Sequence, residues 1–354
     1  MGRAEVLDVA FVVPRSGPAG IVGPSCEACG ALAADEINAA GGVRGREVRL
    51  RPVDGGRTPE AVAREVDALV SAGAVQAVTG WHISAVRQRL VPVVSGRVPY
   101  VYSPLYEGGE RTPGVFLAGE TPDQQLIPAL RWMVHELGVR TWCVVGDDYV
   151  WPLVSAGVVR RWARRSAQLR IVDEVFVPLG TQDFTDAVQR VGRSGAAGVL
   201  MLLVGSDAVR FNRAFAAEGL DTVCVRLSPL MEENMVLASG VEGTHDLYAA
   251  SGFFETLATA AGLDFSRRYA ARFGVEAPVP GALGESCYEG LALLARLVER
   301  AGALDPRELD AAADALAYDS PRGTVRMAGN HLQQSVYLAR ADGLDLDVLA
   351  ELGP

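Results

Sequence analysis

Short runs of apolar, often β-branched residues alternate with longer amphipathic stretches along this chain. The run "VAFVVP", from Val9 to Pro14, precedes a helix-like stretch that ends at Gly41-Gly42, and "EVRLRPVD" then alternates as a strand does. The same strand–helix unit recurs in two successive series, and the last segment predicts a pair of strands. Repeated βαβ units form parallel sheets with helices on both faces, so the pattern predicts an α/β fold with two doubly wound domains.

Length and charge narrow the class of protein. A chain of 354 residues exceeds the about 250–300 residues that one core usually reaches, which also favours two domains. The net charge is −10, and all 33 basic residues are arginines. Without lysine there is neither a P-loop nor Schiff-base chemistry. The arginines are spread along the chain, so we expect no nucleic-acid partner, and the cluster from Arg160 to Arg165 is typical of a solvated helix face.

The sequence predicts neither a membrane span nor a leader. No run of 18 apolar residues occurs, and the apolar stretch from Val9 to Pro14 is too short for a signal sequence. We therefore expect a cytoplasmic protein, or a periplasmic or extracellular one if a leader precedes this sequence.

Cys26 and Cys29 form a C-x-x-C motif, which elsewhere marks redox couples and zinc sites. A redox pair needs an exposed thiolate, and a structural zinc needs two further ligands. No second such motif occurs, and the four histidines are scattered. We interpret these cysteines as small residues that pack the first helix, and we expect no metal and no cofactor.

Several motifs resemble those of one family. "AADEINAAGGVRGREV" resembles the opening of the type I periplasmic-type solute-binding proteins, in the group of branched-chain amino acid and amide/urea receptors. "GWHISAVRQRLVPVV", "YSPLYEGG" and "GDDYVWP" resemble the amide-sensing branch in particular, whose best-known member is a cytoplasmic receptor that regulates the expression of an aliphatic amidase. The resemblance covers nearly the whole chain.

The resemblance implies two α/β lobes that are joined by three crossovers and hold a ligand in a cleft between them. Lobe one would comprise residues 1–118 with 252–323, and lobe two residues 119–251 with 324–354. Ligands of open α/β sheets bind beyond the carboxyl ends of strands. Matching those loops to the family gives the candidate ligand-binding residues: His82, Ser84, Tyr102, Ser103 and Pro104 in lobe one, and Tyr149, Trp151, Ser206 and Glu232 in lobe two.

Some of these residues, and Asp148 next to Tyr149, also have a purely structural interpretation. Ser84 could cap a helix and contact a ligand at the same time, because free helix N–H groups favour an acceptor oxygen. His82 stands where the amide-sensing branch has a tyrosine, so it could contact the ligand or be a satisfied interior histidine. Glu232 and Asp148 could each be helix caps.

The first functional hypothesis is a non-enzymatic receptor whose lobes close on a small polar solute such as a short amide, urea or an amino-acid-like molecule. The closed state would signal to a transcription antitermination regulator or deliver the solute to an ABC permease, and the receptor could form a homodimer. The alternatives are an enzyme that uses His82, Asp148, Tyr149 and Glu232 in the same cleft, or a receptor for a larger pathway intermediate. The sequence contains no nucleophile-elbow motif, no set of metal ligands and no phosphate-binding loop, which makes the enzyme the less favoured hypothesis.

Overall fold

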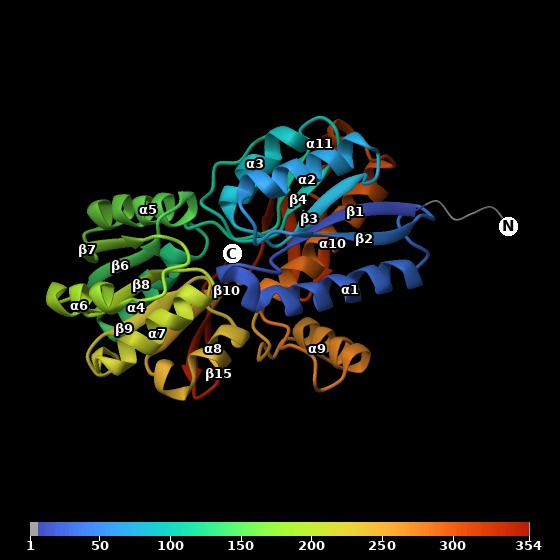
Figure 1. Ribbon diagram of the computed structural model, residues 1–354. Coiled ribbons are helices and arrows are strands. Elements are labelled where there is room, and N and C mark those ends of the chain that lie inside the picture. Colours follow the sequence, from blue (N-terminus) through green and yellow to red (C-terminus); the bar gives the residue numbers. More distant parts are fainter. Residues whose placement is uncertain (1–5, 354) are drawn as a thin grey trace. The chain divides into compact units, whose positions relative to one another are not determined.

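The computed structural model describes residues 6–353, which divide into two compact units (Figure 1). Unit 1 comprises the described residues up to Leu105, together with Gly109–Gly119 and Thr259–Gln334. Unit 2 comprises Tyr106–Gly108, Glu120–Ala258 and the described residues from Ser335 onward. Each unit is therefore assembled from segments that are far apart in the sequence.

Unit 1 is built on an eight-stranded sheet whose central strands are parallel. Its strands, in spatial order, are β11 (Ala317–Ser320), β12 (Gly323–Ala328), β13 (His331–Gln333), β5 (Val115–Leu117), β4 (Tyr100–Tyr102), β3 (Ala77–Gly80), β1 (Val6–Val13) and β2 (Glu47–Asp54). All eight positions of β1 except the first are buried, as expected for a strand covered on both faces.

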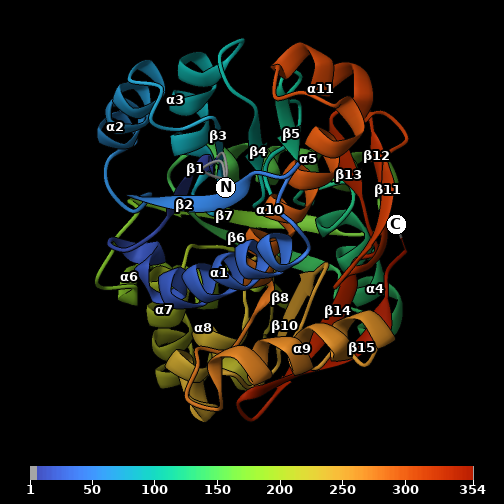
Figure 2. The same cartoon turned by 90° about the vertical axis from the view of Figure 1, so that its right-hand side faces the viewer.

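Helices cover both faces of this sheet. They are α1 (Gly23–Ala39) with the short 3-10 turn η1 (Pro18–Val22) before it, α2 (Pro59–Ser71), α3 (Ser84–Val94), α9 (Ala260–Phe273), α10 (Ala282–Ala301) and α11 (Pro306–Ala313). Helices α1 and α10 pack together on one face, and α2 and α3 pack together on the other (Figures 1 and 2). The buried apolar side chains of α10 join those of β1, β4 and β5 in one core.

The C-x-x-C motif lies inside this packing. Cys26 and Cys29 are both fully buried on α1, and the Cys26 thiol donates a hydrogen bond of 3.5 Å to the Leu283 carbonyl oxygen on α10. Among residues 6–353, no group of three or more His, Cys, Asp or Glu side chains is arranged to hold a metal ion. This environment agrees with the interpretation of the motif as helix packing.

Unit 2 contains a seven-stranded sheet of similar design. Its strands, in spatial order, are β15 (Asp345–Glu351), β14 (Tyr337–Asp342), β10 (Leu247–Ser251), β9 (Val225–Ser228), β8 (Gly198–Leu202), β6 (Thr141–Asp147) and β7 (Arg170–Val177). Strands β6 to β10 are parallel, and β14 and β15 form an antiparallel hairpin at one edge.

The helices of unit 2 are α4 (Leu126–Leu137), α5 (Val150–Ser166), α6 (Thr185–Ser194), α7 (Ser206–Ala217) and α8 (Glu233–Ser239), with 3-10 turns η2 (Leu220–Thr222) and η3 (Val241–Gly243). Helix α5 covers β6 and β7 on one face, and α6 and α7 lie on the other (Figure 1). In the part of the chain that the structure describes, no helix combines the length and the apolar character that a membrane crossing requires.

The third passage of the chain between the units lies later than the crossover expected near Thr324. It falls between Gln334 and Ser335, because β12 and β13 pair within the sheet of unit 1. Apart from the short excursion of Tyr106–Gly108, the first passage falls between Gly119 and Glu120, and the second between Ala258 and Thr259. The last strand pair of the sequence, β14 with β15, belongs to unit 2 alone.

A pair of carboxyl groups lies inside unit 2. Asp147, at the end of β6, and Asp207, in the first turn of α7, are both fully buried. Asp147 accepts a hydrogen bond of 2.8 Å from the Val204 amide, and Asp207 accepts one of 2.6 Å from the Gly180 amide. Burial, with the neighbouring Asp207 carboxylate as the second cause, raises the pKa of Asp147 to about 9, and burial also raises the pKa of Asp207. The pair therefore retains a proton at neutral pH.

The packing of α1 predicts a large effect for Gly30→Ala. A β-carbon at Gly30 would lie 2.3 Å from Cζ of the buried Phe11 ring, so we expect the change to destabilise the protein by about 1–3 kcal/mol through overpacking. Gly157→Ala on α5 is the matched control, because the nearest atom there is a flexible arginine nitrogen at 3.5 Å; it should stabilise by about 0.5–1 kcal/mol. Thermal unfolding followed by circular dichroism measures both. Equal effects of the two substitutions would contradict this packing.

The carboxyl pair predicts a pH dependence of stability. Because the native pKa of Asp147 is raised from 3.8 to about 9, the folded state holds a proton that the unfolded chain has released between these values. Stability should therefore fall as the pH rises through this window, by up to about 1.4 kcal/mol per pH unit. Asp147→Asn should remove this contribution and so make the slope shallower, and Asp148→Asn, at an exposed neighbour, should leave the slope unchanged. A wild-type slope in the Asp147→Asn protein, measured by denaturant unfolding from pH 5 to 8, would refute the assignment.

Candidate functional site

The carboxyl ends of β1, β3 and β4 meet at one edge of the unit 1 sheet, where ligands of parallel sheets bind. Gly80, the last residue of β3, has a φ of 125°, and a β-carbon there would lie 2.4 Å from the Val12 carbonyl oxygen. Glycine is therefore required for the chain to leave β3 so close to β1. This turn carries Trp81 and His82 to the start of α3.

His82 lies in the interior of this edge and has a partner for each ring nitrogen. Nδ1 lies 3.1 Å from the Val12 carbonyl oxygen, and Nε2 lies 2.6 Å from the Tyr100 hydroxyl. A carbonyl oxygen only accepts, so Nδ1 carries the proton and Nε2 accepts from the Tyr100 hydroxyl. Burial lowers the pKa of His82 to about 4, which keeps the ring neutral at pH 7. The structure thus gives His82 an internal positioning role in place of a free polar group for a ligand.

Tyr102 holds the same turn from β4. Its buried hydroxyl donates a hydrogen bond of 2.9 Å to the His82 carbonyl oxygen, and its ring packs edge-on against the imidazole at 5.3 Å. The two tyrosines and His82 therefore tie the ends of β1, β3 and β4 together. The sequence analysis named Tyr102 as a pocket residue but did not identify Tyr100, whose importance depends on this spatial proximity.

Ser84 begins α3. The N-cap position is Ile83, whose side chain makes no capping hydrogen bond, so Ser84 is the first helical residue and the capping interpretation of Ser84 is wrong. The Ser84 hydroxyl lies 3.4 Å from the Tyr102 hydroxyl, a long and therefore weak contact. The N–H groups of the first turn of a helix have no intrahelical acceptor. Hydrogen-bond donors are thus concentrated at this point.

The loop after β4 offers few polar side-chain groups that are available to a ligand. The buried Ser103 hydroxyl donates a hydrogen bond of 3.2 Å to the Gly80 carbonyl oxygen, and Pro104 is buried beside it. The following segment, Tyr106–Gly108, belongs to unit 2. Ser103 therefore helps to fix the turn after β3.

In unit 2, the two aromatic residues that the sequence predicts to bind the ligand lie next to each other. Tyr149 is the N-cap residue of α5 and is partly exposed, whereas Trp151 is buried in the first turn; their ring centroids are 6.2 Å apart. They follow β6, whose neighbour β8 leads to Ser206 at the start of α7. Asp148, beside them, is exposed and makes no cap of α5.

Glu232 is the N-cap of α8, as one of its two interpretations expected. It is fully buried, and its carboxyl group accepts hydrogen bonds of 3.3 Å from the Met235 amide and 2.9 Å from the Asn234 side chain. Burial, and then the adjacent Glu233, raise the pKa of Glu232 to about 8. A carboxyl group engaged in this way is part of the helix start.

These placements remove the main support for the enzyme hypothesis. His82 has no lone pair left to act as a base, and Glu232 caps a helix. Asp148 is exposed and caps no helix.

Trp81 is a residue of this edge that the sequence analysis did not single out. Its side chain is 2% exposed, and among the described residues none accepts a hydrogen bond from its indole nitrogen Nε1. Its place directly after a predicted strand and one residue before His82 was the signal that could have found it.

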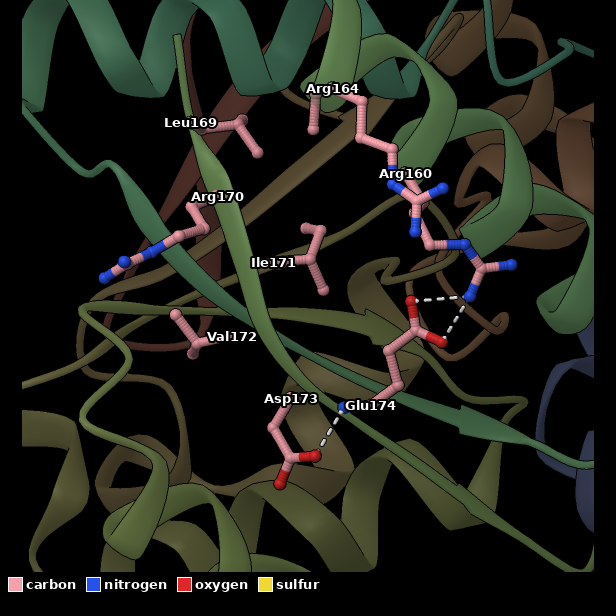
Figure 3. A pocket seen from close by; sticks show the side chains of 9 residues that line it. Arg160, Arg164, Leu169, Arg170, Ile171, Val172, Asp173 and Glu174 are labelled. Carbon is pink, nitrogen blue, oxygen red and sulfur yellow. Dashed lines mark hydrogen bonds and ion pairs between the residues drawn. The ribbon is translucent and has the colours of Figure 1, made fainter. Parts of the chain in front are cut away.

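A surface hollow of about 430 Å³ lies elsewhere in unit 2, between α5 and β7 (Figure 3). None of the predicted ligand-binding residues lines it. Arg160 points to Glu174 and pairs with both carboxylate oxygens, at 2.9 and 2.7 Å (Figure 3). Arg164 lies in the last turn of α5, where the negative end of the helix dipole stabilises a cation. These arginines therefore form the solvated helix face that the sequence predicted.

Comparisons with known proteins give a consistent picture. The model of a family described as "Periplasmic binding protein" matches residues 6–345. A protein of Brucella melitensis biotype 1 named "Leu/Ile/Val-binding protein homolog 6" is 26% identical over 358 residues, which cover 96% of this chain and 89% of that protein.

Solved structures agree on the fold. A solute binding protein of an ABC transporter from Rhodopseudomonas palustris BisB5, in complex with 3,4-dihydroxy benzoic acid, has a TM-score of 0.86 at 21% identity, covering 98% of this chain and 97% of that one. The branched-chain amino acid transporter substrate binding protein LivJ from Streptococcus pneumoniae, in complex with isoleucine, has a TM-score of 0.85 at 20% identity, covering 98% and 99%. None of these names points to the amide-sensing branch. With a family match that spans nearly its whole length, the chain belongs to the periplasmic binding protein family and is a solute-binding protein, not an enzyme.

Proposed function

We propose that this protein binds a small organic solute through a carboxylate or carbonyl oxygen at the start of α3 and delivers it to an ABC permease. The observation that carries the proposal is the set of donors on the carboxyl edge of the unit 1 sheet. The names of the similar proteins support the transporter context, because they refer to ABC transporters and to branched-chain amino acid or benzoic acid ligands. This context favours a location outside the cytoplasm over the cytoplasmic one expected from the sequence.

The start of α3 offers what an acceptor oxygen needs. The Val86 N–H already donates to the Ile83 carbonyl oxygen at 2.9 Å, but Ile83 supplies no side-chain cap for the N–H groups of Ser84 and Ala85, which lie too early in the helix for an intrahelical acceptor. The Ser84 hydroxyl adds a further donor, since its contact with the Tyr102 hydroxyl is weak. The positive end of the helix dipole also favours a negative group, by about 0.3–1 kcal/mol at exposed sites and more when partly buried.

Buried charges near this edge are already compensated. Arg87 on α3 is buried and pairs with Glu110, so it is not a spare cation for the solute. His82 is neutral for the reason given above. The solute oxygen would therefore be held by N–H and O–H donors, as is usual in sites where a few placed polar groups set the orientation.

The amide or urea sensor expected from the sequence is the second candidate. It is favoured by the loop after β4, whose Ser103 hydroxyl is used on the Gly80 carbonyl and so adds no donor for a carboxylate. A sensor of this kind would signal to a regulator of antitermination, whereas a carboxylate-binding protein would serve a permease. The choice of ligand therefore separates the two candidates.

A thermal-shift screen tests the proposal. The compounds are isoleucine, leucine, benzoate and 4-hydroxybenzoate, with acetamide, butyramide and urea as the amide group. A ligand present at a hundred times its dissociation constant stabilises the folded state by about 2.7 kcal/mol, so a binder raises the melting temperature by several degrees. We expect the shift from a carboxylate compound. A shift from amides or urea alone would replace the first candidate with the second, and no shift would contradict both.

Contact of the solute with Tyr149 and Trp151 of unit 2 stays a prediction from the sequence. Tyr149→Ala should weaken binding of the compound found in the screen more than tenfold, because it removes a large aromatic contact area. Tyr149→Phe keeps the ring and should retain most of the affinity. Titration calorimetry measures both variants. Unchanged affinity in Tyr149→Ala would exclude the residue from the site.

A further inference from the structure

The Trp81 indole is an unsatisfied hydrogen-bond donor in the interior of the protein. Its Nε1 is buried and has no acceptor among the described residues. Buried indole N–H groups usually find a partner, because a donor that has lost water without gaining an acceptor destabilises the fold. Trp142 in unit 2 shows the ordinary case, since its buried Nε1 donates a hydrogen bond of 3.1 Å to the Val139 carbonyl oxygen.

The polar side chains that hold the neighbouring residue His82 and the turn after β3 are, by contrast, hydrogen-bonded. His82 uses both ring nitrogens, and the hydroxyls of Tyr100 and Tyr102 bond to its ring and to its carbonyl oxygen. The Ser103 hydroxyl bonds to the Gly80 carbonyl oxygen. The unsatisfied Nε1 of Trp81 therefore belongs to the residue directly after β3, next to His82 in the chain and three residues before Ser84.

We propose that Trp81 is a specificity-determining residue whose Nε1–H donates a hydrogen bond to an oxygen of the bound solute. This inference rests on the proposed function and narrows the class of ligand to carboxylates. The other groups proposed for the same solute, the first-turn N–H groups of α3 and the Ser84 hydroxyl, are donors as well. A carboxylate has two oxygens, and both only accept hydrogen bonds. A carboxamide, by contrast, would place its own N–H donors opposite the N–H and O–H donors of the protein.

The test compares acids with their amides. Dissociation constants of 4-hydroxybenzoate and 4-hydroxybenzamide, and of isoleucine and isoleucinamide, are measured by titration calorimetry. We expect the wild type to bind the acid of at least one pair ten times more tightly than its amide. Trp81→Phe keeps an aromatic ring but removes the N–H, so it should weaken binding of that acid at least tenfold and reduce the preference over the amide. Trp142→Phe, which removes a satisfied N–H from unit 2, should leave both affinities unchanged.

Two outcomes would overturn the assignment. One is acid affinity that Trp81→Phe leaves intact, and the other is an equal loss for acid and amide, which indicates a role in packing alone. The ligand-free proteins give an independent check. Trp81→Phe should lower the melting temperature less than Trp142→Phe does, because it breaks no internal hydrogen bond. An equal fall would mean that Nε1 already has an internal partner.

Failure of the proposed function would look different. If no compound of the screen shifts the melting temperature of the wild type, the solute-binding proposal fails in the form given above. The comparison of the ligand-free variants then still decides whether Nε1 is unsatisfied, and an equal fall in melting temperature would refute the Trp81 assignment separately.

Discussion

The arrangement of the strand ends at the carboxyl edge of the unit 1 sheet depends on the two hydrogen bonds of the neutral His82 imidazole. A charged ring would be very costly in this interior, and a neutral ring has one donor and one acceptor. The donor is used on β1 and the acceptor on the Tyr100 hydroxyl of β4, so the ring sets the distance between strand ends that are not adjacent in the sheet. The chain direction into α3, and with it every donor proposed for the solute, follows from that arrangement.

The two units share a doubly wound design and differ in the polar groups at their strand ends. Unit 1 carries a neutral histidine, tyrosines and N–H donors there. Unit 2 carries buried carboxyl groups, Asp147 and Glu232, whose raised pKa values keep them protonated at neutral pH. A protonated carboxyl group can stay inside because it has lost its charge, so these acids serve the interior of unit 2 and are not available as anions.

The fold was largely predictable because strand–helix alternation is a local pattern, and β1 and α2 form where that pattern places them. The last crossover was not, because short alternating strands such as β12 can pair with either sheet and the pattern contains no information on the partner. The site divides in the same way. Position after a strand predicted that a helix starts near Ser84, and α3 begins there. The role of His82, in contrast, depends on which atoms of distant strands approach it, such as the hydroxyl of Tyr100.

The discontinuous make-up of each unit has a consequence for the order of events during synthesis. Helix α10, which covers α1 and the central strands of unit 1, is translated only after most of unit 2, and the edge hairpin β14–β15 of unit 2 follows it. Chains with separate domains can fold the first one while the second is still being made. Here the core of unit 1 cannot close until α10 has been made, so its first strands stay without that helix while most of unit 2 is synthesised.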